Sequence, residues 1–236
     1  MTGNPTIRTV TDAAALARLY TDILEPSFPP SERVTRTDFV EGGASGALDV
    51  LAAQDDDGYL GAIVGERFGN GYLVDWLAVN GARRGGGTGS ALITAGITRW
   101  IAEPGIDLVL AEIERPDLFE PHPKYGDPAR RLAFYHRLGA TLLDLPYYQP
   151  PISEGLPRVR NLLLIVLAAR DDTPPPRTLN LDETAAVRTM LHAAMGSLEE
   201  GDAETAQVYA AVDSPSGVRL LPLTDYTLVP VLDQGL

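Results

Sequence analysis

The chain of 236 residues has no cysteine and a single lysine, Lys124. Without cysteine there is no disulfide bond, no thiolate ligand for a metal ion and no cysteine nucleophile. A Walker-type phosphate loop needs a lysine directly after its last glycine, but in the glycine-rich stretch of this chain Gly89 is followed by Ser90. These absences exclude a disulfide bond, a thiolate metal site, a cysteine nucleophile and a Walker-type loop.

Long hydrophobic runs are also missing. The longest, Leu162–Ala169, is far shorter than the roughly 20 apolar residues that a helix needs to cross a bilayer. The N-terminal segment, MTGNPTIRTV, contains no apolar signal sequence. We therefore expect a soluble, cytoplasmic protein without a membrane partner.

Basic residues are few compared with acidic ones. The chain has 19 Lys and Arg against 32 Asp and Glu, a net charge of −13 at pH 7. Nucleic acid phosphates require a basic surface, so a nucleic acid partner is excluded, and a cationic or neutral partner is favoured. Residues 171–236 alone hold 11 acidic and 3 basic residues, so part of the charge belongs to the surface of this tail.

The most informative stretch covers residues 72–100. Aromatic, β-branched and aliphatic residues from Tyr72 to Val79 predict a strand. A glycine-rich loop follows, and from Thr88 the apolar residues recur at helical spacing, with Thr88 or Ser90 available to cap the first turn. Amides of such a loop and of a helix N-terminus point at one spot where the helix dipole adds positive charge, which predicts a phosphate site.

The spacing of the loop discriminates between phosphate ligands. A dinucleotide fingerprint requires glycines at offsets 0, 2 and 5, but counted from Gly85 the third position is Ser90. The loop instead reads Arg84-x-x-Gly87-x-Gly89, preceded by Leu77-Ala78-Val79. This pattern resembles the acyl-CoA pyrophosphate loop of the GNAT acetyltransferase superfamily.

A second motif strengthens the resemblance. Residues 133–140, AFYHRLGA, are similar to the helix that follows the fifth strand in that superfamily and ends in an aromatic-Tyr-x-x-Leu-Gly pattern. The order and spacing of the two motifs also match. The resemblance covers residues 5–170 and is specific in these two segments alone.

The resemblance and the residue patterns together predict an α/β fold of the α+β type. We expect a mixed, mostly antiparallel central sheet of about seven strands, flanked by helices and followed by a C-terminal helical extension. Residues 1–170 would form a GNAT-like acyl-CoA-binding domain, and residues 171–236, after three prolines, an acidic extension with helices over 182–198 and 203–212. The extension would dock on the core or on the partner subunit of a homodimer, and the sequence leaves both open.

Two helices, the link between them and a hairpin turn are expected before the glycine-rich loop. A first helix begins at Asp12 and a second ends at Gly42-Gly43. The Pro-Pro link over residues 28–33 either borders the acceptor side of the cleft, as the resemblance implies, or only connects the helices. Asp55-Asp56-Asp57-Gly58 is a hairpin tip by its Asp-Gly turn, so we expect no metal there.

The resemblance also assigns roles in acetyl-CoA binding. Backbone groups of Leu77 and Val79 would pair with the pantetheine arm, and loop amides would hold the pyrophosphate with Arg84 adding a charge-assisted contact. The residues expected to bind acetyl-CoA are Leu77, Ala78, Val79, Arg84, Gly85, Gly86, Gly87, Thr88, Gly89 and Ser90.

Two kinds of catalytic residue follow. Tyr135 stands where the superfamily places the tyrosine that protonates the departing thiolate, although a tyrosine on a helix also packs into cores. For the base that takes a proton from the amine, we rank Glu112 first and Asp75 second, with Glu114 on the same face of its strand as Glu112. An ion pair with Arg115, Arg130 or Arg131 is an equal alternative for Glu112.

The predicted function is transfer of an acetyl group from acetyl-CoA to a primary amine, carried by a small molecule or a peptide and cationic in solution. The loop over residues 115–127 and the Tyr147-Tyr148-Gln149 link would form walls that choose among amines. Two alternatives are a non-catalytic acyl-CoA-binding module that regulates a partner and an acyltransferase that uses a longer acyl-CoA.

Overall fold

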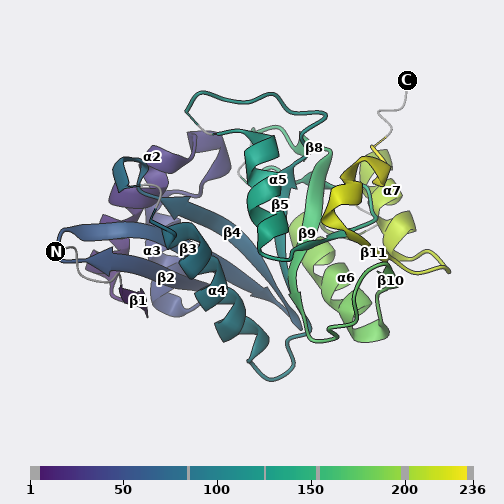
Figure 1. Ribbon diagram of the computed structural model, residues 1–236, viewed down its shortest axis with the longest axis horizontal. Coiled ribbons are helices and arrows are strands. Elements are labelled where there is room, and N and C mark those ends of the chain that lie inside the picture. Colours follow the sequence, from purple (N-terminus) through teal and green to yellow (C-terminus); the bar gives the residue numbers. More distant parts are fainter. Residues whose placement is uncertain (1–5, 84–85, 125, 153–154, 198–201, 233–236) are drawn as a thin grey trace. The chain divides into compact units, whose positions relative to one another are not determined.

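The structure is a computed structural model that describes residues 6–83, 86–124, 126–152, 155–197 and 202–232 (Figure 1). The chain divides into two compact units. The first unit holds Met1–Arg67, Val74–Ala102 and Ile152–Leu156, and the second holds Phe68–Leu73, Glu103–Pro151 and Pro157–Leu236.

The strands confirm the predicted fold class and add to it. In hydrogen-bonding order the main sheet reads β1-β2-β3-β4-β5-β9-β6-β11-β10, and β7 pairs with β8 separately. The sheet therefore has nine strands instead of the predicted seven, because the tail contributes β10 and β11. The described pairings, including β2 with β3 and β5 with β9, are antiparallel.

The elements of the first unit follow the chain to the end of the glycine-loop helix. They are β1 (Thr6–Thr9), α1 (Ala13–Leu19), the π-helical turn η1 (Tyr20–Leu24), α2 (Glu25–Ser27), the 3₁₀ turn η2 (Pro30–Glu32), α3 (Arg36–Ser45), β2 (Leu48–Asp55), β3 (Gly58–Phe68), β4 (Gly71–Val79), the 3₁₀ turn η3 (Gly81–Arg83) and α4 (Thr88–Ile101). The last residue of β3 and the first three residues of β4 belong to the second unit.

The first helix begins and buries its apolar side as predicted. Asp12 is its N-cap, and its Oδ1 atom accepts a hydrogen bond of 2.8 Å from the amide of Ala15. Leu16, Leu19 and Ile23 are fully buried and pack with one face of β2, β3 and β4. Burial of this stripe, and not helix propensity, holds so short a helix in place.

The predicted end of the second helix is wrong. Helix α3 continues through Gly42 and Gly43 and ends at Ser45, with Gly46 as its C-cap at a left-handed φ of 81°. A Cβ on Gly42 would lie 2.8 Å from the side chain of Leu48, and one on Gly43 would lie 2.8 Å from Leu16. These two glycines therefore permit close packing and do not terminate the helix.

Strands β2 and β3 pair as an antiparallel hairpin in the sheet of the first unit. The aspartates of the predicted tip lie at its turn, with Gly58 at a positive φ of 122°. Gly61 and Gly65 make room for neighbours, since a Cβ at Gly61 would lie 2.5 Å from the carbonyl oxygen of Ala78 and one at Gly65 would lie 2.7 Å from the Trp100 ring. Helix α4 is thus packed directly on the strand.

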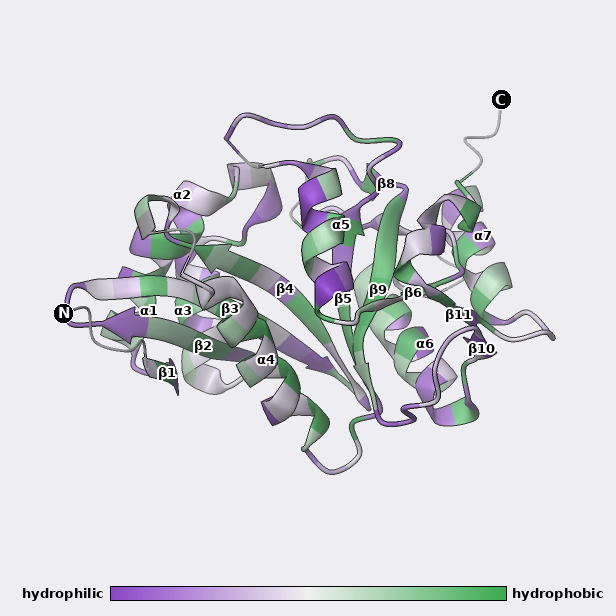
Figure 2. Ribbon diagram, viewed as in Figure 1, coloured by the Kyte–Doolittle hydropathy of each residue, from purple (hydrophilic) through white to green (hydrophobic). Residues whose placement is uncertain are grey.

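The second unit contains the remaining elements. They are β5 (Leu108–Glu114), α5 (Pro128–Arg137), β6 (Thr141–Leu143), β7 (Tyr148–Gln149), β8 (Val159–Arg160), β9 (Leu162–Ala169), β10 (Arg177–Thr178), α6 (Leu181–Met195), α7 (Ala203–Val212), β11 (Arg219–Pro222) and the 3₁₀ turn η4 (Leu223–Leu228). Strand β9 is hydrophobic along its length (Figure 2), as expected for a strand with both faces covered.

The tail over residues 171–236 is part of the second unit's core. Apolar residues of α6 and α7, such as Val187, Met190 and Val208, are buried together with Leu108 and Leu164 of the sheet. The tail is not only helical as predicted, because β11 pairs with β6, placing Leu221 opposite Leu142. Long-range pairing of this kind cannot be seen in a local sequence pattern.

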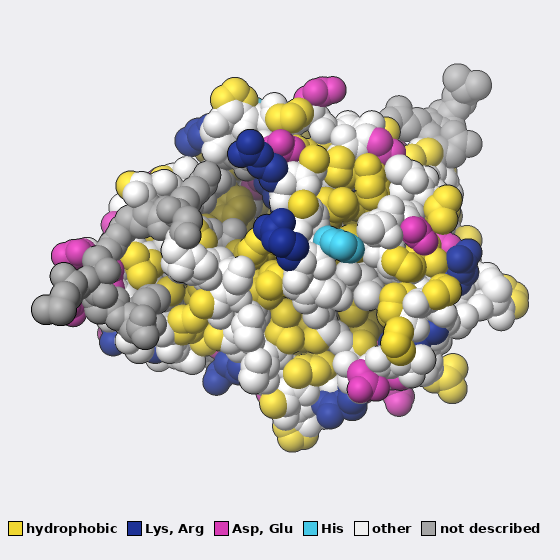
Figure 3. Space-filling model, in the orientation of Figure 1, with side chains coloured by type: hydrophobic (Ala, Val, Ile, Leu, Met, Phe, Trp, Pro, Cys, Tyr) yellow, Lys and Arg dark blue, Asp and Glu magenta, His cyan; other side chains and the backbone are white. Residues whose placement is uncertain are grey.

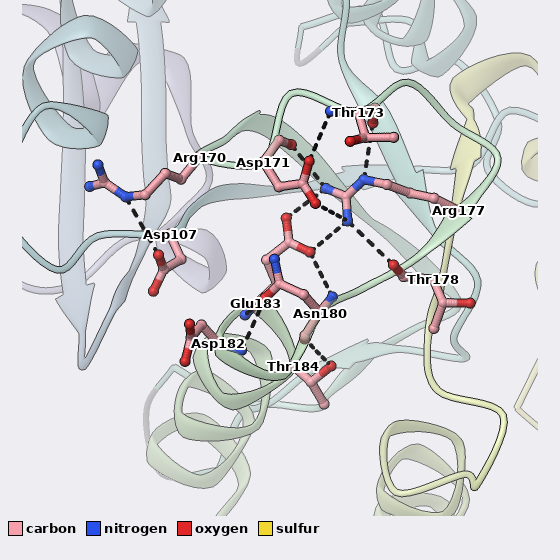
Figure 4. Close-up of polar contacts among 10 residues, drawn as sticks. All are labelled: Asp107, Arg170, Asp171, Thr173, Arg177, Thr178, Asn180, Asp182, Glu183 and Thr184. Atoms are coloured by element: carbon pink, nitrogen blue, oxygen red, sulfur yellow. Dashed lines mark hydrogen bonds and ion pairs between the residues drawn. The ribbon is translucent and has the colours of Figure 1, made fainter.

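A buried ion pair fixes the start of the tail (Figure 4). The two terminal nitrogens of Arg177 each donate to one carboxylate oxygen of Glu183 at 2.6 Å. Glu183 is fully buried and also belongs to the capping box of α6, in which it accepts a bond of 2.9 Å from the amide of Asn180. Arg177 additionally donates to the backbone oxygens of Asp171 and Thr173.

Within the described residues, no helix is both long and apolar enough to cross a membrane.

Candidate active site

The glycine-rich loop has the predicted strand-loop-helix geometry. Strand β4 ends at Val79, and the amide of Asn80 still donates to Leu60 of the neighbouring strand at 2.9 Å. The Asn80 side chain then accepts from the amide of Ala82 at 3.0 Å, which starts the short turn η3. Arg84 and Gly85 lie outside the described residues, so the predicted contacts of these two residues stay predictions.

Gly86 and Gly87 are not required by packing. A Cβ at either position would meet no atom within 4 Å, and both residues are exposed. Gly87 has a left-handed φ of 78°, which accounts for glycine there, but the backbone of Gly86 carries no such constraint. A glycine that neither packing nor φ explains is expected where a ligand approaches the backbone closely.

Helix α4 begins directly after these glycines. Its N-cap is Gly87, so the predicted capping by Thr88 or Ser90 is wrong. Thr88 is buried, Gly89 and Ser90 are partly buried, and the first turn contains no acidic residue. No carboxylate of the first turn therefore neutralises the amides and the dipole at the start of the helix. This end of α4 can accept an anion.

Strand β4 presents alternating faces. Trp76 and Ala78 are buried against α1 and α3, whereas Asp75, Leu77 and Val79 point to the other face and are partly buried. The side chains of Leu77 and Val79 therefore share a face with Asp75. The candidate base Asp75 and the two residues predicted to pair with the pantetheine arm thus lie within the last five residues of one strand, just before the glycine loop.

Glu112 is held by two residues that the sequence analysis had placed in a wall of the site. The Tyr147 hydroxyl donates to one carboxylate oxygen of Glu112, and the Gln149 amide donates to the other at 2.6 Å. Burial raises the pKa of the Glu112 carboxyl above its ordinary value, and the two hydrogen bonds act against this rise. The described contacts of Glu112 are thus neutral donors, not an ion pair.

The three arginines proposed as ion-pair partners bind other groups. Arg131 donates to Glu114 at 2.8 Å, and Arg130 lies 3.7 Å from Asp127. Arg115 is buried, pairs with Asp117 at 2.9 Å and donates to the Val229 carbonyl oxygen at 3.0 Å. Glu114 is therefore engaged in an ion pair, while Glu112 keeps a carboxylate with a raised pKa.

Tyr135 lies near the end of α5, one helical turn after Arg131. Its side chain is 6% exposed, and burial raises its pKa to about 12, with the Arg131 charge acting in the opposite direction. Phe134 packs edge-to-face on the Tyr135 ring with centroids 5.1 Å apart. Among the described residues none hydrogen-bonds to the Tyr135 hydroxyl, so this group has no structural role that would compete with proton transfer.

The predicted catalytic residues fall in both units. Asp75 belongs to the first unit, and Glu112, Glu114 and Tyr135 belong to the second. The sequence did not indicate that Tyr147 and Gln149 bind Glu112, or that Arg33 and Tyr20 line a cavity in the first unit. Of these residues, only Tyr147 and Gln149 were expected near the site, because they are polar residues in a proline-rich link.

On the face shown in Figure 3, acidic and basic side chains are interspersed and do not gather into one acidic patch. In the described part of the chain, no group of three or more His, Asp or Glu side chains could hold a metal ion.

Comparison with known proteins gives structural neighbours. No family model matches the chain, and no curated protein matches it either. A solved structure from Bacteroides thetaiotaomicron, described as an acetyltransferase of the GNAT family, is 26% identical with a TM-score of 0.58 and covers 80% of this chain and 96% of that chain. Another, from Desulfovibrio desulfuricans and also described as a GNAT acetyltransferase, is 22% identical with a TM-score of 0.48 and covers 70% of this chain and 100% of that chain.

The first of these likenesses extends over almost the whole neighbour. It agrees with the two sequence motifs, since the glycine loop precedes α4 and the aromatic-tyrosine motif ends α5. Fold and motifs therefore both support membership of the GNAT acetyltransferase superfamily.

Proposed function

We propose that this protein transfers the acetyl group of acetyl-CoA to a primary amine. The observation that carries the proposal is the start of α4, where two exposed glycines with open space beside them precede a helix whose first turn has no acidic residue. The pyrophosphate of CoA is the anion that the superfamily would place there, bound by amides of Gly87 to Ser90.

The proposed reaction needs one group that accepts a proton and one that donates a proton. The neutral amine attacks the thioester carbonyl carbon, a C–N bond forms, the C–S bond breaks and the thiolate of CoA receives a proton. Glu112 is proposed to take a proton from the amine, and Tyr135 to give one to the sulfur. Asp75, on the face of β4 shared with Leu77 and Val79, is the second candidate for the base.

The amine is proposed to be cationic in solution. Asp75 and Glu112 would raise the local concentration of such a substrate, and a carboxylate with a raised pKa is a better base than an ordinary one. The acceptor is a small molecule or a peptide amine. A regulatory protein that only binds acyl-CoA would share the loop but would acetylate no amine.

Replacing Gly86 by aspartate tests the loop. Because Gly86 has open space and no positive φ, Gly86→Asp adds a negative charge beside the pyrophosphate site without backbone strain. We expect acetyl-CoA affinity, measured by calorimetry, to fall at least roughly tenfold, about 1.4 kcal/mol. Gly86→Ala is the matched control and should bind nearly as well as wild type. Equal affinity of the aspartate variant would remove the loop from the CoA site.

The pH dependence of turnover tests Glu112. Since burial raises its pKa, the carboxyl stays protonated to a higher pH than an ordinary glutamate, so kcat should rise through this shifted pKa and then level off. Glu112→Gln should lower kcat about 100-fold or more and remove this acidic limb. The free energy of unfolding should show the opposite trend. Because the pKa of Glu112 is higher in the folded state than in the unfolded state, the contribution of Glu112 to stability decreases as pH rises through the folded-state pKa. An unchanged acidic limb in the glutamine variant would transfer the role to Asp75.

A further inference from the structure

A cavity of about 450 Å³ lies in the first unit, apart from the glycine loop. It is bordered by the π-helical turn η1, by the link that follows α2 and by the start of α3. Its polar lining residues are Tyr20, Glu25, Arg33, Thr35, Arg36 and Asp38. A π-helical turn is rare and is often found at functional sites, and here Tyr20 begins one.

Arg33 has an incomplete set of partners in this cavity. Its Nη1 donates to the Tyr20 hydroxyl, which in turn donates to the Val34 carbonyl oxygen at 2.8 Å. Its Nη2 lies 3.5 Å from Glu25, a long contact to a side chain that is 51% exposed. Its Nε is buried and has no hydrogen-bond partner within the described residues. A buried N–H without a partner is costly, so it calls for an explanation.

The free edge of Arg33 matches one chemical group. Nε and Nη2 form one side of the guanidinium, and a carboxylate binds that side through two parallel hydrogen bonds. One oxygen would satisfy Nε, and the other would replace the long contact of Nη2 with Glu25. Tyr20 supports this arrangement, because it holds Nη1 on the opposite side and its ring lies 5.4 Å from the guanidinium carbon.

One hydrogen bond connects the backbone beside Arg33 with β4, the strand of the proposed acyl site. The Trp76 indole donates to the carbonyl oxygen of Glu32 at 2.8 Å, and Glu32 directly precedes Arg33. Trp76 stands between Asp75 and Leu77 in β4. The same hydrogen bond therefore fixes the backbone beside Arg33 relative to the strand that would carry the acetyl group, all within the first unit.

We propose that the cavity binds the carboxylate of a small ligand through the Nε–Nη2 edge of Arg33, and that this ligand is an acceptor carrying both a primary amine and a carboxylate. The identity of the ligand as acceptor rests on the proposed function, whereas the carboxylate site does not. The lining holds two arginines and two acids, a balance that suits a zwitterion better than a purely cationic amine.

A matched pair of probes tests the proposal. γ-Aminobutyrate and γ-aminobutyramide have the same chain and amine, and differ in carboxylate against neutral amide. Calorimetry on the full chain should show γ-aminobutyrate binding at least roughly tenfold tighter, as expected for a charge-assisted bidentate contact. Equal binding of the two probes, or no binding of γ-aminobutyrate, would overturn the carboxylate site.

Three variants locate the contact. Arg33→Gln should abolish the preference for the carboxylate, and Arg33→Lys should retain only part of it because lysine lacks the planar fork. Glu25→Gln should have the opposite effect and tighten γ-aminobutyrate binding several-fold, since it removes the internal competitor for Nη2. Arg18→Gln, an exposed arginine of α1 outside the cavity, is the control for loss of a positive charge. A preference that survives in both Arg33 variants would overturn the assignment.

Acetylation assays with acetyl-CoA separate the two proposals. If both probes are acetylated with equal kcat/KM, the carboxylate inference fails while the proposed function stands. If neither is acetylated but the Arg33-dependent binding preference holds, the carboxylate site stands and its ligand is not an acceptor. Preferential acetylation of γ-aminobutyrate that is lost in Arg33→Gln would support both.

Discussion

Replacing Arg177 by methionine should destabilise the protein by about 3 kcal/mol or more, the cost of leaving a buried charge without its partner. Glu183 is fully buried and both its oxygens receive hydrogen bonds from Arg177 (Figure 4). Without the guanidinium, this carboxylate would keep only the Asn180 amide as a described partner. For a chain of this size the loss corresponds to a fall of roughly 6 to 12 °C in the melting midpoint.

The partner substitution should cost less. In Glu183→Gln the side-chain oxygen can still accept from the Asn180 amide, and Arg177 keeps the backbone oxygens of Asp171, Thr173 and Thr178. The double variant Arg177→Met with Glu183→Leu should lose less than the two single losses added together, because no charge is then left buried.

A surface pair in the same region provides the control. Arg188 of α6 pairs with Asp213, and their side chains are 51% and 43% exposed. Exposed ion pairs contribute about 0 to 1 kcal/mol, so Arg188→Met should leave the midpoint nearly unchanged. If Arg177→Met and Arg188→Met had equal effects in calorimetric melting, the Arg177–Glu183 pair would not be what fixes the tail.

Periodicity predicted most elements between Asp12 and Gly139 because they are local. The cap at Asp12 and the turn at Gly58 each depend on a few neighbouring residues. The end of α3 was misplaced because a glycine can serve close packing as well as termination. Sequence alone does not show that Gly43 faces Leu16.

Features that depend on distant pairing could not be predicted. Strand β11 is recognised as a strand through its partner β6, and β7 through β8. The π-helical turn at Tyr20 is a shift in backbone hydrogen bonding without a composition of its own. The two helices of the tail, α6 and α7, were therefore predicted, whereas its strands β10 and β11 were not.

In the candidate site, too, the local features were predictable from the sequence and the contacts between distant residues were not. The order of strand, glycine loop and helix was predicted from spacing, because it depends on residues that are neighbours in the chain. The environment of Glu112 was not, because its donors Tyr147 and Gln149 lie 35 and 37 residues further along the chain. Arg33 was noted only as part of a proline-rich link, and its buried Nε is visible in the structure alone.

Replacing Tyr135 by phenylalanine should lower kcat by about 100-fold to 10,000-fold, the usual contribution of a general acid, while leaving acetyl-CoA affinity near that of wild type. Burial raises the pKa of Tyr135 to about 12, so the hydroxyl carries its proton throughout the neutral range. Burial acts in the same direction on a thiol, because it disfavours the charged thiolate. A desolvated sulfur that becomes negative as the C–S bond breaks can therefore accept a proton from this phenol.

The substitution should not harm the fold. No described residue hydrogen-bonds to the Tyr135 hydroxyl, and the ring keeps its edge-to-face contact with Phe134. Tyr209→Phe is the matched control: it removes a hydroxyl that donates to the Gly196 carbonyl oxygen at 2.7 Å, so it should cost about 1 kcal/mol of stability and leave kcat unchanged. Single-turnover rates, CoA titration and melting curves on both variants decide the matter. Wild-type turnover in Tyr135→Phe, or a loss of kcat that follows a loss of stability, would make Tyr135 a packing residue and leave the departing thiolate to be protonated by solvent.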